Sequence, residues 1–303
     1  MELITSTLVM SRLFFRKMNP PDTQRPRSRK HFTRCRQQCT SNAELASFWL
    51  ATLEATEASD GDGQHESNNE ITKCPVDYVV GLYSSFAAKF DQLLVDKLEY
   101  QTPTMLRKLL DKLSIESGPI PGKLKKKRRL GVDLGCGTGL SGMAFRDVVD
   151  SLIGVDLSEK MLEQARCRNI YKDLILGDVT CVFSGNGIIY DLVIACDVFV
   201  YIGDLSEVFH AVSTSMEPSG IFCFSTEYLE DSQSCPRPFR LHSCARFAHK
   251  QTYIEDLAKE FRFEILKLEV ASIRKNEGKP VKGMLVILRP ENPVLVARLK
   301  ETH

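Results

Sequence analysis

The feature that most constrains the fold of this chain is a glycine-rich turn between a buried strand and a helix. The segment VDLGCGTGLSG, residues 132–142, begins as an apolar strand and then passes through alternate glycines. Gly135, Gly137 and Gly139 let the backbone turn tightly and approach a ligand closely, and the next helix offers the N–H groups of its first turn. This arrangement predicts a nucleotide site at the end of the strand.

Strands and helices alternate from this turn to the end of the chain. Seven segments have the apolar composition of strands: 130–134, 152–156, 173–177, 190–196, 220–226, 262–273 and 281–288. The helices between them begin at capping residues, namely Ser158 and the boxes Asp204-x-x-Glu207 and Thr252-x-x-Glu255. These βα repeats predict an α/β fold with a doubly wound, seven-stranded, mostly parallel sheet and helices on both faces. The short turn before the last strand makes that strand antiparallel.

Residues 74–122 form an N-terminal helical lid in this prediction, ahead of a core that spans 123–303. Apolar residues recur at helical spacing over 82–98, which predicts a first helix. Thr102 and Pro103 supply a cap and a first-turn proline for a second helix.

The first 73 residues differ in composition from the rest. Residues 1–41 hold nine Lys or Arg against two acids and are rich in Ser and Thr, which predicts a transit segment for a chloroplast or mitochondrion. The alternative is a basic tail on a cytoplasmic protein. Residues 42–73 are mostly polar and acidic, and we expect a flexible linker there, with folded structure beginning near residue 75.

Composition excludes several classes of protein. Lys and Arg number 40 against 39 acids, and a net charge of +1 excludes a globally basic nucleic-acid binder. No apolar run approaches the roughly 18–20 residues of a membrane span. The ten cysteines lack the spacing of a disulfide framework, and no Cys/His cluster has metal-ligand spacing. The oligomeric state stays open.

Two carboxylates indicate which nucleotide the glycine turn would bind. Asp156 ends the second predicted strand, where a carboxylate accepts hydrogen bonds from a ribose diol. Asp133 lies just before Gly135, at a position that is usually apolar in dinucleotide-binding folds. A carboxylate there suits a ligand with positive charge, such as the sulfonium and ammonium of S-adenosylmethionine (AdoMet), and disfavours the pyrophosphate of NAD.

These segments resemble the successive motifs of class I (Rossmann-like) AdoMet-dependent methyltransferases, over about residues 83–290. The matching segments, in order, are 132–139, 154–162, 174–179, 190–204 and 216–227. More narrowly, YSSFAAKFD, DVFVYIGDL and RLHSCARFAHKQTYI resemble bacterial methyltransferases that are often fused to tetratricopeptide repeats. The resemblance to methyltransferases of quinone and biotin synthesis is more distant. We find no tetratricopeptide repeat in this chain.

The resemblance implies a set of cofactor-binding residues at the strand ends. These are Asp133, Gly135, Cys136, Gly137, Gly139, Asp156, Leu157, Asp178, Val179, Asp197 and Phe199. Asp156 would hold the ribose hydroxyls, and Asp178 would accept a hydrogen bond from the adenine amino group. Asp197 would lie at the methionine end of AdoMet, with Phe199 near the transferred methyl group.

The acceptor side is predicted from residue type and position. The sulfonium is already an activated methyl donor, so a general base is needed only for an acceptor that is protonated at the working pH. His249 and Tyr201 are the candidate bases, although a lone histidine can equally be structural. An insertion at about 230–250 is expected to shape the acceptor site. The predicted acceptor contacts are Arg240 and Arg246 in this insertion, Tyr253 in the next helix and Phe90 in the lid.

The absence of two sequence motifs narrows the range of possible methyl acceptors. The segment after the fourth predicted strand lacks the Asn/Asp-Pro-Pro-Tyr/Phe turn, and a Pro-Cys nucleophile is also missing, which argues against methylation of DNA bases and of protein glutamine. A small molecule methylated on a carboxylate or hydroxyl oxygen is the main hypothesis. The alternatives are a non-catalytic module with the AdoMet-binding fold and an NAD-dependent oxidoreductase. The intact glycine and carboxylate set argues against the first, and Asp133 argues against the second.

Overall fold

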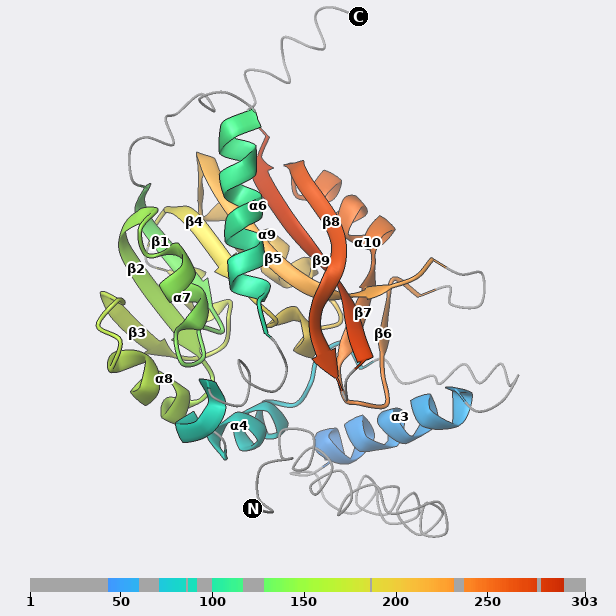
Figure 1. The fold of residues 1–303 in the computed structure, drawn as a ribbon. Coiled ribbons are helices and arrows are strands. Elements are labelled where there is room, and N and C mark those ends of the chain that lie inside the picture. The colour runs from blue at the N-terminus through green and yellow to red at the C-terminus, as the bar shows by residue number, and fades with distance from the viewer. Residues whose placement is uncertain are drawn as a thin grey trace, which may run out of the picture.

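The computed structural model describes residues 43–59, 71–85, 87–91, 100–116, 128–185, 187–231, 237–276 and 279–291 (Figure 1). The proposed transit segment, residues 1–41, lies outside these ranges. So do Phe86 of the predicted lid and residues 232–236 of the predicted insertion. Within the described ranges, no helix has the length and apolarity to cross a membrane.

A single mixed sheet forms the centre of the molecule. Its strands are β1 (Arg128–Leu134), β2 (Val149–Asp156), β3 (Asp173–Leu176), β4 (Tyr190–Ala195), β5 (Met216–Leu229), β6 (Phe239–Leu241), β7 (Phe247–Lys250), β8 (Phe263–Asn276) and β9 (Lys279–Pro290). The order β3-β2-β1-β4-β5 is parallel throughout, and β9 lies antiparallel between β5 and β8. The predicted α/β class and antiparallel end are confirmed. The sheet has nine described strands, however, because the insertion adds β6 and β7.

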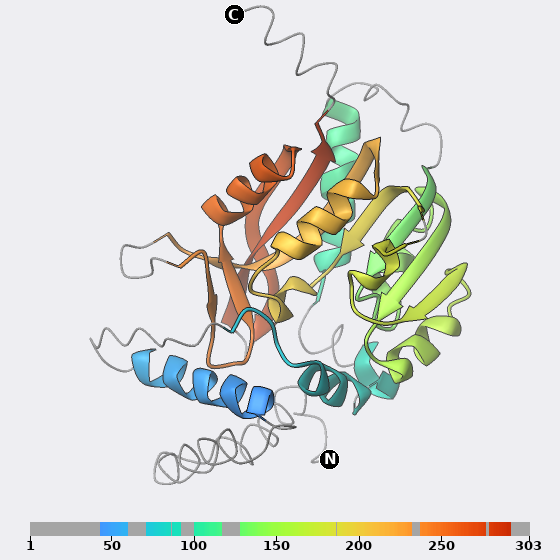
Figure 2. The ribbon, with the colours of Figure 1, turned by 180° about the vertical axis from the view of Figure 1, so that it is seen from behind.

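Helices cover both faces of the sheet. The helices are α3 (Ala43–Ser59), α4 (Val76–Ser84), α6 (Thr102–Glu116), α7 (Leu140–Phe145), α8 (Glu159–Arg166), α9 (Ser206–Thr214) and α10 (Gln251–Glu260), with 3-10 turns η3 (Ala87–Lys89), η4 (Cys181–Phe183) and η5 (Phe199–Tyr201). Figures 1 and 2 show α6 and α7 on one face and α9 and α10 on the other.

Side-chain alternation along the central strands explains the two layers. On β4, Leu192 packs with the α6 side of the core, and its neighbour Val193 packs with the α9 and α10 side. On β5, Cys223 packs on the α6 side and Phe222 packs on the α9 and α10 side. Successive side chains of a strand point to opposite faces, so an apolar run without polar interruption requires a covering layer on each face.

The β6–β7 hairpin extends the sheet beyond the end of β4. β4 pairs with β5 as far as Phe224, and β7 pairs with β5 in parallel from Glu227 to Leu229. Because β9 occupies the other edge of β5 at Glu227, β7 continues the edge that β4 leaves. The hairpin thereby brings the predicted acceptor insertion beyond the carboxyl end of β4.

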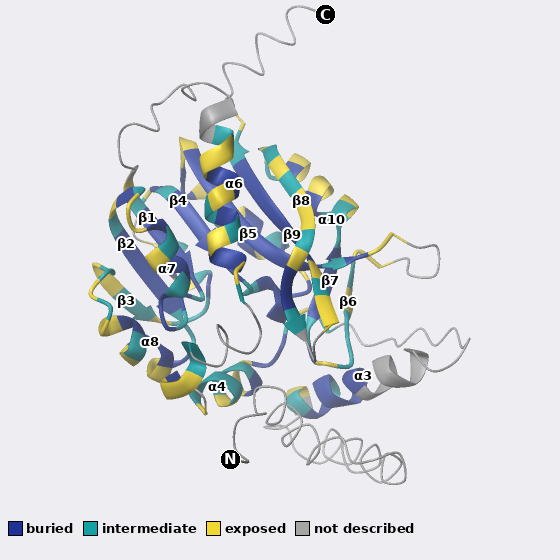
Figure 3. Cartoon of the chain, in the orientation of Figure 1, coloured by how far each residue is buried: buried dark blue, intermediate teal, exposed yellow. Residues whose placement is uncertain are grey.

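A buried helix lies where the sequence predicts a flexible linker. Phe48 and Trp49 of α3 are fully buried, and their rings lie 5.1 and 5.4 Å from that of Tyr78. They share one apolar cluster with Tyr201 and Phe247, and Figure 3 shows the dark blue, buried part of α3. The linker prediction is therefore wrong for residues 43–59, and folded structure begins well before residue 75. The apolar half of α3 precedes the acidic stretch whose composition suggested a linker.

Candidate functional site

The glycine turn after β1 has a backbone that other residues tolerate poorly. Gly135 and Gly137 have φ angles of +62° and +54°, in the left-handed region. A Cβ atom on Gly135 would also lie 2.5 Å from Cγ2 of Val198. The turn therefore needs glycine at position 135 both for its backbone angle and for its close approach to the loop after β4.

Asp156 connects this turn to the end of β2. Its Oδ2 accepts a hydrogen bond from the Gly137 N–H at 2.9 Å, and its Oδ1 accepts one from the Ser158 N–H at 2.8 Å. Burial raises the pKa of Asp156, although these backbone N–H groups partly oppose the shift. The carboxylate faces a cavity, as predicted for a group that binds hydroxyls.

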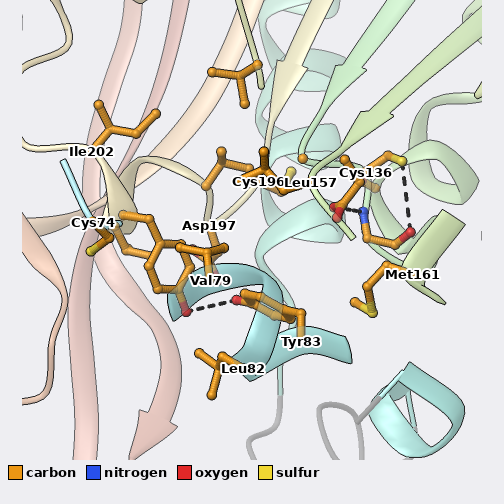
Figure 4. A pocket seen from close by; sticks show the side chains of 18 of the residues that line it. Cys74, Val79, Leu82, Tyr83, Cys136, Leu157, Met161, Cys196, Asp197 and Ile202 are labelled. Carbon is orange, nitrogen blue, oxygen red and sulfur yellow. Dashed lines mark hydrogen bonds between the residues drawn. The ribbon is translucent and has the colours of Figure 1, made fainter. Parts of the chain in front are cut away.

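The cavity lies at the carboxyl ends of the parallel strands, beside α4 (Figure 4). Its walls come from the glycine turn, the segments that follow β2, β3 and β4, the residues around α4, the loop before β7, and β8. The polar and ionisable groups among the lining residues are Lys73, Tyr83, Tyr100, Thr138, Ser141, Asp156, Asp178, Asp197, Tyr201, Arg246 and Arg274. The remaining lining residues are aliphatic or aromatic, apart from three glycines and three cysteines.

Most predicted cofactor residues line this cavity. They are Gly135, Cys136, Gly137, Asp156, Leu157, Asp178, Val179 and Asp197. Asp178 faces Lys73, whose Nζ lies 2.5 Å from its Oδ2. Burial opposes ionisation of Asp178, but the Lys73 ammonium and Thr180 outweigh it and lower the pKa.

Three predicted cofactor residues lie outside the cavity lining. Asp133 is fully buried, and its Oδ2 accepts hydrogen bonds from Ser141 Oγ and Tyr171 OH, each at 2.7 Å. Burial raises the pKa of Asp133 to about 6. Gly139 caps α7 with a φ of +94°, and Phe199 packs in the core. We therefore assign these three residues to shaping the turn and the strand ends rather than to cofactor contact.

His249 does not occupy the position of a general base. Its ring is fully buried, and Nε2 lies 2.9 and 3.0 Å from the carbonyl oxygens of Ile202 and Gly203. Nδ1 faces the Thr226 hydroxyl, and burial lowers the His249 pKa to about 4. With Nε2 donating and Nδ1 accepting, the neutral ring is fully engaged within the protein. The structure therefore contradicts the predicted catalytic role and assigns His249 a structural one.

Some of the residues predicted for the acceptor side line the cavity, and others do not. Tyr201, Arg246 and Phe90 line the cavity. Arg240 is exposed on β6, and Tyr253 hydrogen-bonds Asp204 and the Leu205 N–H away from the cavity lining. The roles predicted for Arg240 and Tyr253 are therefore not supported, because β6 and α10 direct these side chains elsewhere.

A buried ionic cluster at the β4 and β5 ends escaped the sequence analysis. Arg274 of β8 bonds through Nη2 to Glu227 of β5, and its Nη1 lies 3.8 Å from Oδ2 of Asp197. Asp197 has a φ of +56°, and the Ser225 hydroxyl bonds both its N–H and its Oδ1. Arg274 lies one residue beyond the predicted strand 262–273, so no local pattern marked it as inward-facing.

Helix α4 is anchored beside the cavity by polar contacts. The hydroxyl groups of Tyr83 and Tyr201 lie 2.9 Å apart, and the Cys74 N–H donates to the carbonyl oxygen of Tyr201 at 2.8 Å. The Tyr83 ring also meets the edge of Phe90. Figure 4 shows Tyr83, Leu82 and Val79 of α4 on the same side of the cavity. This arrangement supports the lid interpretation and supplies an apolar wall.

Comparison with known proteins identifies the central part of the chain. Residues 132–224 match the model of a family described as a methyltransferase domain. Over 48 residues, 16% of this chain, it is 46% identical to bovine 18S rRNA (guanine-N(7))-methyltransferase. Over 99 residues, 31% of this chain, it is 30% identical to the biotin biosynthesis bifunctional protein BioHC of Saccharophagus degradans. Each match covers 17% of the relative's own length.

Solved structures with a similar architecture include several methyltransferases. An AdoMet-dependent methyltransferase from Clostridium acetobutylicum has a TM-score of 0.48 and 18% identity, and the match covers 69% of this chain and 99% of that one. The N-methyltransferase NodS from Bradyrhizobium japonicum, in complex with S-adenosylhomocysteine, has a TM-score of 0.48 and 15% identity, covering 70% and 98%. The family model matches residues 132–224 as a methyltransferase domain, which agrees with the methyltransferase prediction for this part of the chain.

Proposed function

We propose that this chain transfers the methyl group of AdoMet to a carboxylate or hydroxyl oxygen of a small-molecule acceptor. One observation carries the proposal: the Gly135–Gly137 turn, fixed by Asp156, opens into the same cavity that Asp197 borders at the end of β4. A ligand that extends from Asp156 to Asp197 would cross the ends of β2, β1 and β4, which are neighbours in the sheet. Crevices at the carboxyl ends of such strands are the usual ligand sites of open α/β sheets.

The residues present fit AdoMet. Asp156 supplies a partly buried acceptor for the ribose hydroxyls, and Leu157 and Val179 supply apolar surface for the adenine. Asp178 supplies an acceptor for the adenine amino group, although Lys73 shares it. The backbone of Gly135 and Gly137 borders the cavity where the methionine part would lie. When bound, AdoMet would supply an electrophilic methyl group on sulfur, and the chain would orient the two reactants and exclude water.

The cavity walls favour a small acceptor. Tyr83, Phe90 and Tyr201 form an aromatic group beside the glycine turn, and α4 supplies one wall of the cavity. Enclosure by α4 suits an acceptor that fits within the cavity rather than a base within a large folded nucleic acid. The short match to an rRNA methyltransferase makes RNA the acceptor to include as a comparison.

The test measures methyl transfer by the full chain. Methyl-labelled AdoMet is incubated with the chain and either a metabolite extract or total RNA, and the label is followed into each fraction. We expect label in an esterase-sensitive or ether-linked small molecule, and no such transfer by Asp156→Ala. Label found in RNA alone would contradict the proposal that the acceptor is a small molecule. Tight S-adenosylhomocysteine binding without any transfer would favour the non-catalytic alternative.

We propose further that residues 1–41 direct import into an organelle. Their excess of basic residues, with Ser and Thr and few acids, supports this. A fluorescent protein fused after residue 41 should accumulate in mitochondria or chloroplasts. Diffuse cytoplasmic fluorescence would contradict the proposal.

A further inference from the structure

Two arginine side chains reach the end of the cavity that Asp197 borders. Arg274 projects from β8 and Arg246 from the loop before β7, and both line the cavity. Arg274 is only 7% exposed, and the Arg246 side chain is 26% exposed. Charges held away from water need partners, because the protein interior replaces their hydration poorly.

A single carboxylate is the nearest partner of both arginines. Glu227 accepts a hydrogen bond from Arg274 Nη2, and its Oε1 lies 3.7 Å from Arg246 Nη1. Asp197 is more distant, since its Oδ2 lies 3.8 Å from Arg274 Nη1, beyond hydrogen-bond distance. The oxygens of Asp197 instead accept hydrogen bonds from the hydroxyls of Ser225 and Thr102, at 3.0 and 3.4 Å.

One guanidinium nitrogen of Arg274 is left without a hydrogen-bond acceptor among the described residues. Nη1 is buried and has no hydrogen-bond partner among the described residues. An unsatisfied guanidinium nitrogen is costly in a folded protein, so its presence on a cavity wall indicates that a ligand supplies the acceptor. Glu227 and Asp197 together face the two guanidinium groups, so a ligand would be recognised by the free donors of Arg274 Nη1 and not by a surplus of charge. A carboxylate matches the planar donor geometry of a guanidinium.

We propose that Arg274 and Arg246 form a carboxylate-binding subsite at this end of the cavity. The inference rests on the proposed function and deepens it, because two ligands of that reaction carry a carboxylate. One is an acceptor with an apolar body, for which Val79, Leu82 and Ile202 provide the adjoining wall. The other is the methionine part of AdoMet itself.

The experiment compares pairs of ligands with and without a carboxylate. Calorimetric titrations of the full chain use cinnamate and octanoate against their neutral amides, with and without S-adenosylhomocysteine. A second pair is S-adenosylhomocysteine and 5′-methylthioadenosine, which lacks the amino-acid part with its carboxylate and its ammonium. The variants are Arg274→Gln, Arg246→Gln and Arg274→Gln/Glu227→Gln, and the last avoids leaving Glu227 as an unpaired buried charge. Arg146→Gln changes an exposed arginine after α7 and is the control.

The subsite predicts a selective loss of affinity for the carboxylate member of a pair. If it holds the acceptor, Arg274→Gln weakens cinnamate or octanoate binding by about 10- to 100-fold and leaves the amides unchanged. If it holds AdoMet, the same loss falls on S-adenosylhomocysteine and spares 5′-methylthioadenosine. Arg146→Gln changes neither pair.

The proposal is overturned if folded Arg274→Gln and the double variant leave both affinity ratios at their wild-type values. It is overturned equally by a second combination of results. In this case, wild-type protein binds neither cinnamate nor octanoate better than the matching amide, and Arg274→Gln does not change the relative affinities for S-adenosylhomocysteine and 5′-methylthioadenosine. Failure of the proposed function has a different signature. In that case, wild-type protein binds neither S-adenosylhomocysteine nor 5′-methylthioadenosine, while the cinnamate and octanoate titrations still test the arginines.

Discussion

The Asp156 carboxylate lies 2.9 Å from the Gly137 N–H, and this contact connects the end of β2 to the glycine turn that follows β1. The two residues are 19 positions apart, yet neighbouring parallel strands bring them to the same edge of the sheet. The contact positions the carboxylate between the backbone of the turn and the cavity. The proposed cofactor binding and the conformation of the turn would therefore be coupled through one side chain.

The glycine turn should tolerate substitution far less well than a helical glycine. Gly135→Ala adds a Cβ 2.5 Å from Val198 at a φ of +62°, and we expect a loss of about 1–3 kcal/mol in unfolding free energy, with weaker S-adenosylhomocysteine binding. Gly81→Ala is the control, because nothing lies within 4 Å of its Cβ in α4, and it should gain about 0.5–1 kcal/mol. Urea denaturation measures both. Equal stability of the two variants would contradict the strained turn.

The attachment of α4 to the cavity wall depends on the paired hydroxyls of Tyr83 and Tyr201. A double-mutant cycle with Tyr83→Phe and Tyr201→Phe should give a coupling of about 0.5–1.5 kcal/mol in unfolding free energy, the usual contribution of one hydrogen bond. Strict additivity of the two substitutions would show that the 2.9 Å contact does not hold the helix.

His249 should make the protein less stable in mild acid. The folded pKa is lowered to about 4 by burial, from an ordinary value of 6.5, so the unfolded chain binds the extra proton between these pH values. The stabilising contribution of His249 is therefore complete above pH 6.5 and falls by up to about 3 kcal/mol as the pH decreases toward 4. Asp133, with its raised pKa, acts in the opposite direction over the same range, but it is present in both wild type and variant. His249→Gln should therefore change the slope of unfolding free energy against pH in this range, whereas exposed His210→Gln should not. An unchanged slope in His249→Gln would refute the assignment.

Helix α3 should contribute to the stability of the whole domain. Trp49 is 1% exposed and packs on Tyr78, and Trp49→Ala should lower the unfolding free energy by about 3–5 kcal/mol. Glu44→Gln, at an exposed position of the same helix, is the control. A chain that starts at Lys73 should show a comparable loss. Unchanged stability in Trp49→Ala and in the truncated chain would mean that α3 is an appendage.

Features that depend on residues close together in the chain could be predicted from the sequence, and features that depend on distant residues could not. The glycine turn and Asp156 were predictable because strand, turn and helix follow one another within a short segment. The antiparallel pairing of β8 and β9 was predictable from the short turn between them. Arg274 and Glu227 were not, because they meet only when β9 pairs with both β5 and β8 and so brings these two strands to either side of it. His249 was a reasonable candidate base by residue type, but its burial depends on the β6–β7 hairpin, which has no strong local signal.

Titration of the full chain with S-adenosylhomocysteine, AdoMet and NAD tests the central claim most directly. We expect micromolar binding of the first two, no binding of NAD, and loss of binding by about 10-fold or more in Asp156→Ala. Folded wild-type protein that binds neither AdoMet nor S-adenosylhomocysteine, or that binds NAD instead, would contradict the assignment of this cavity.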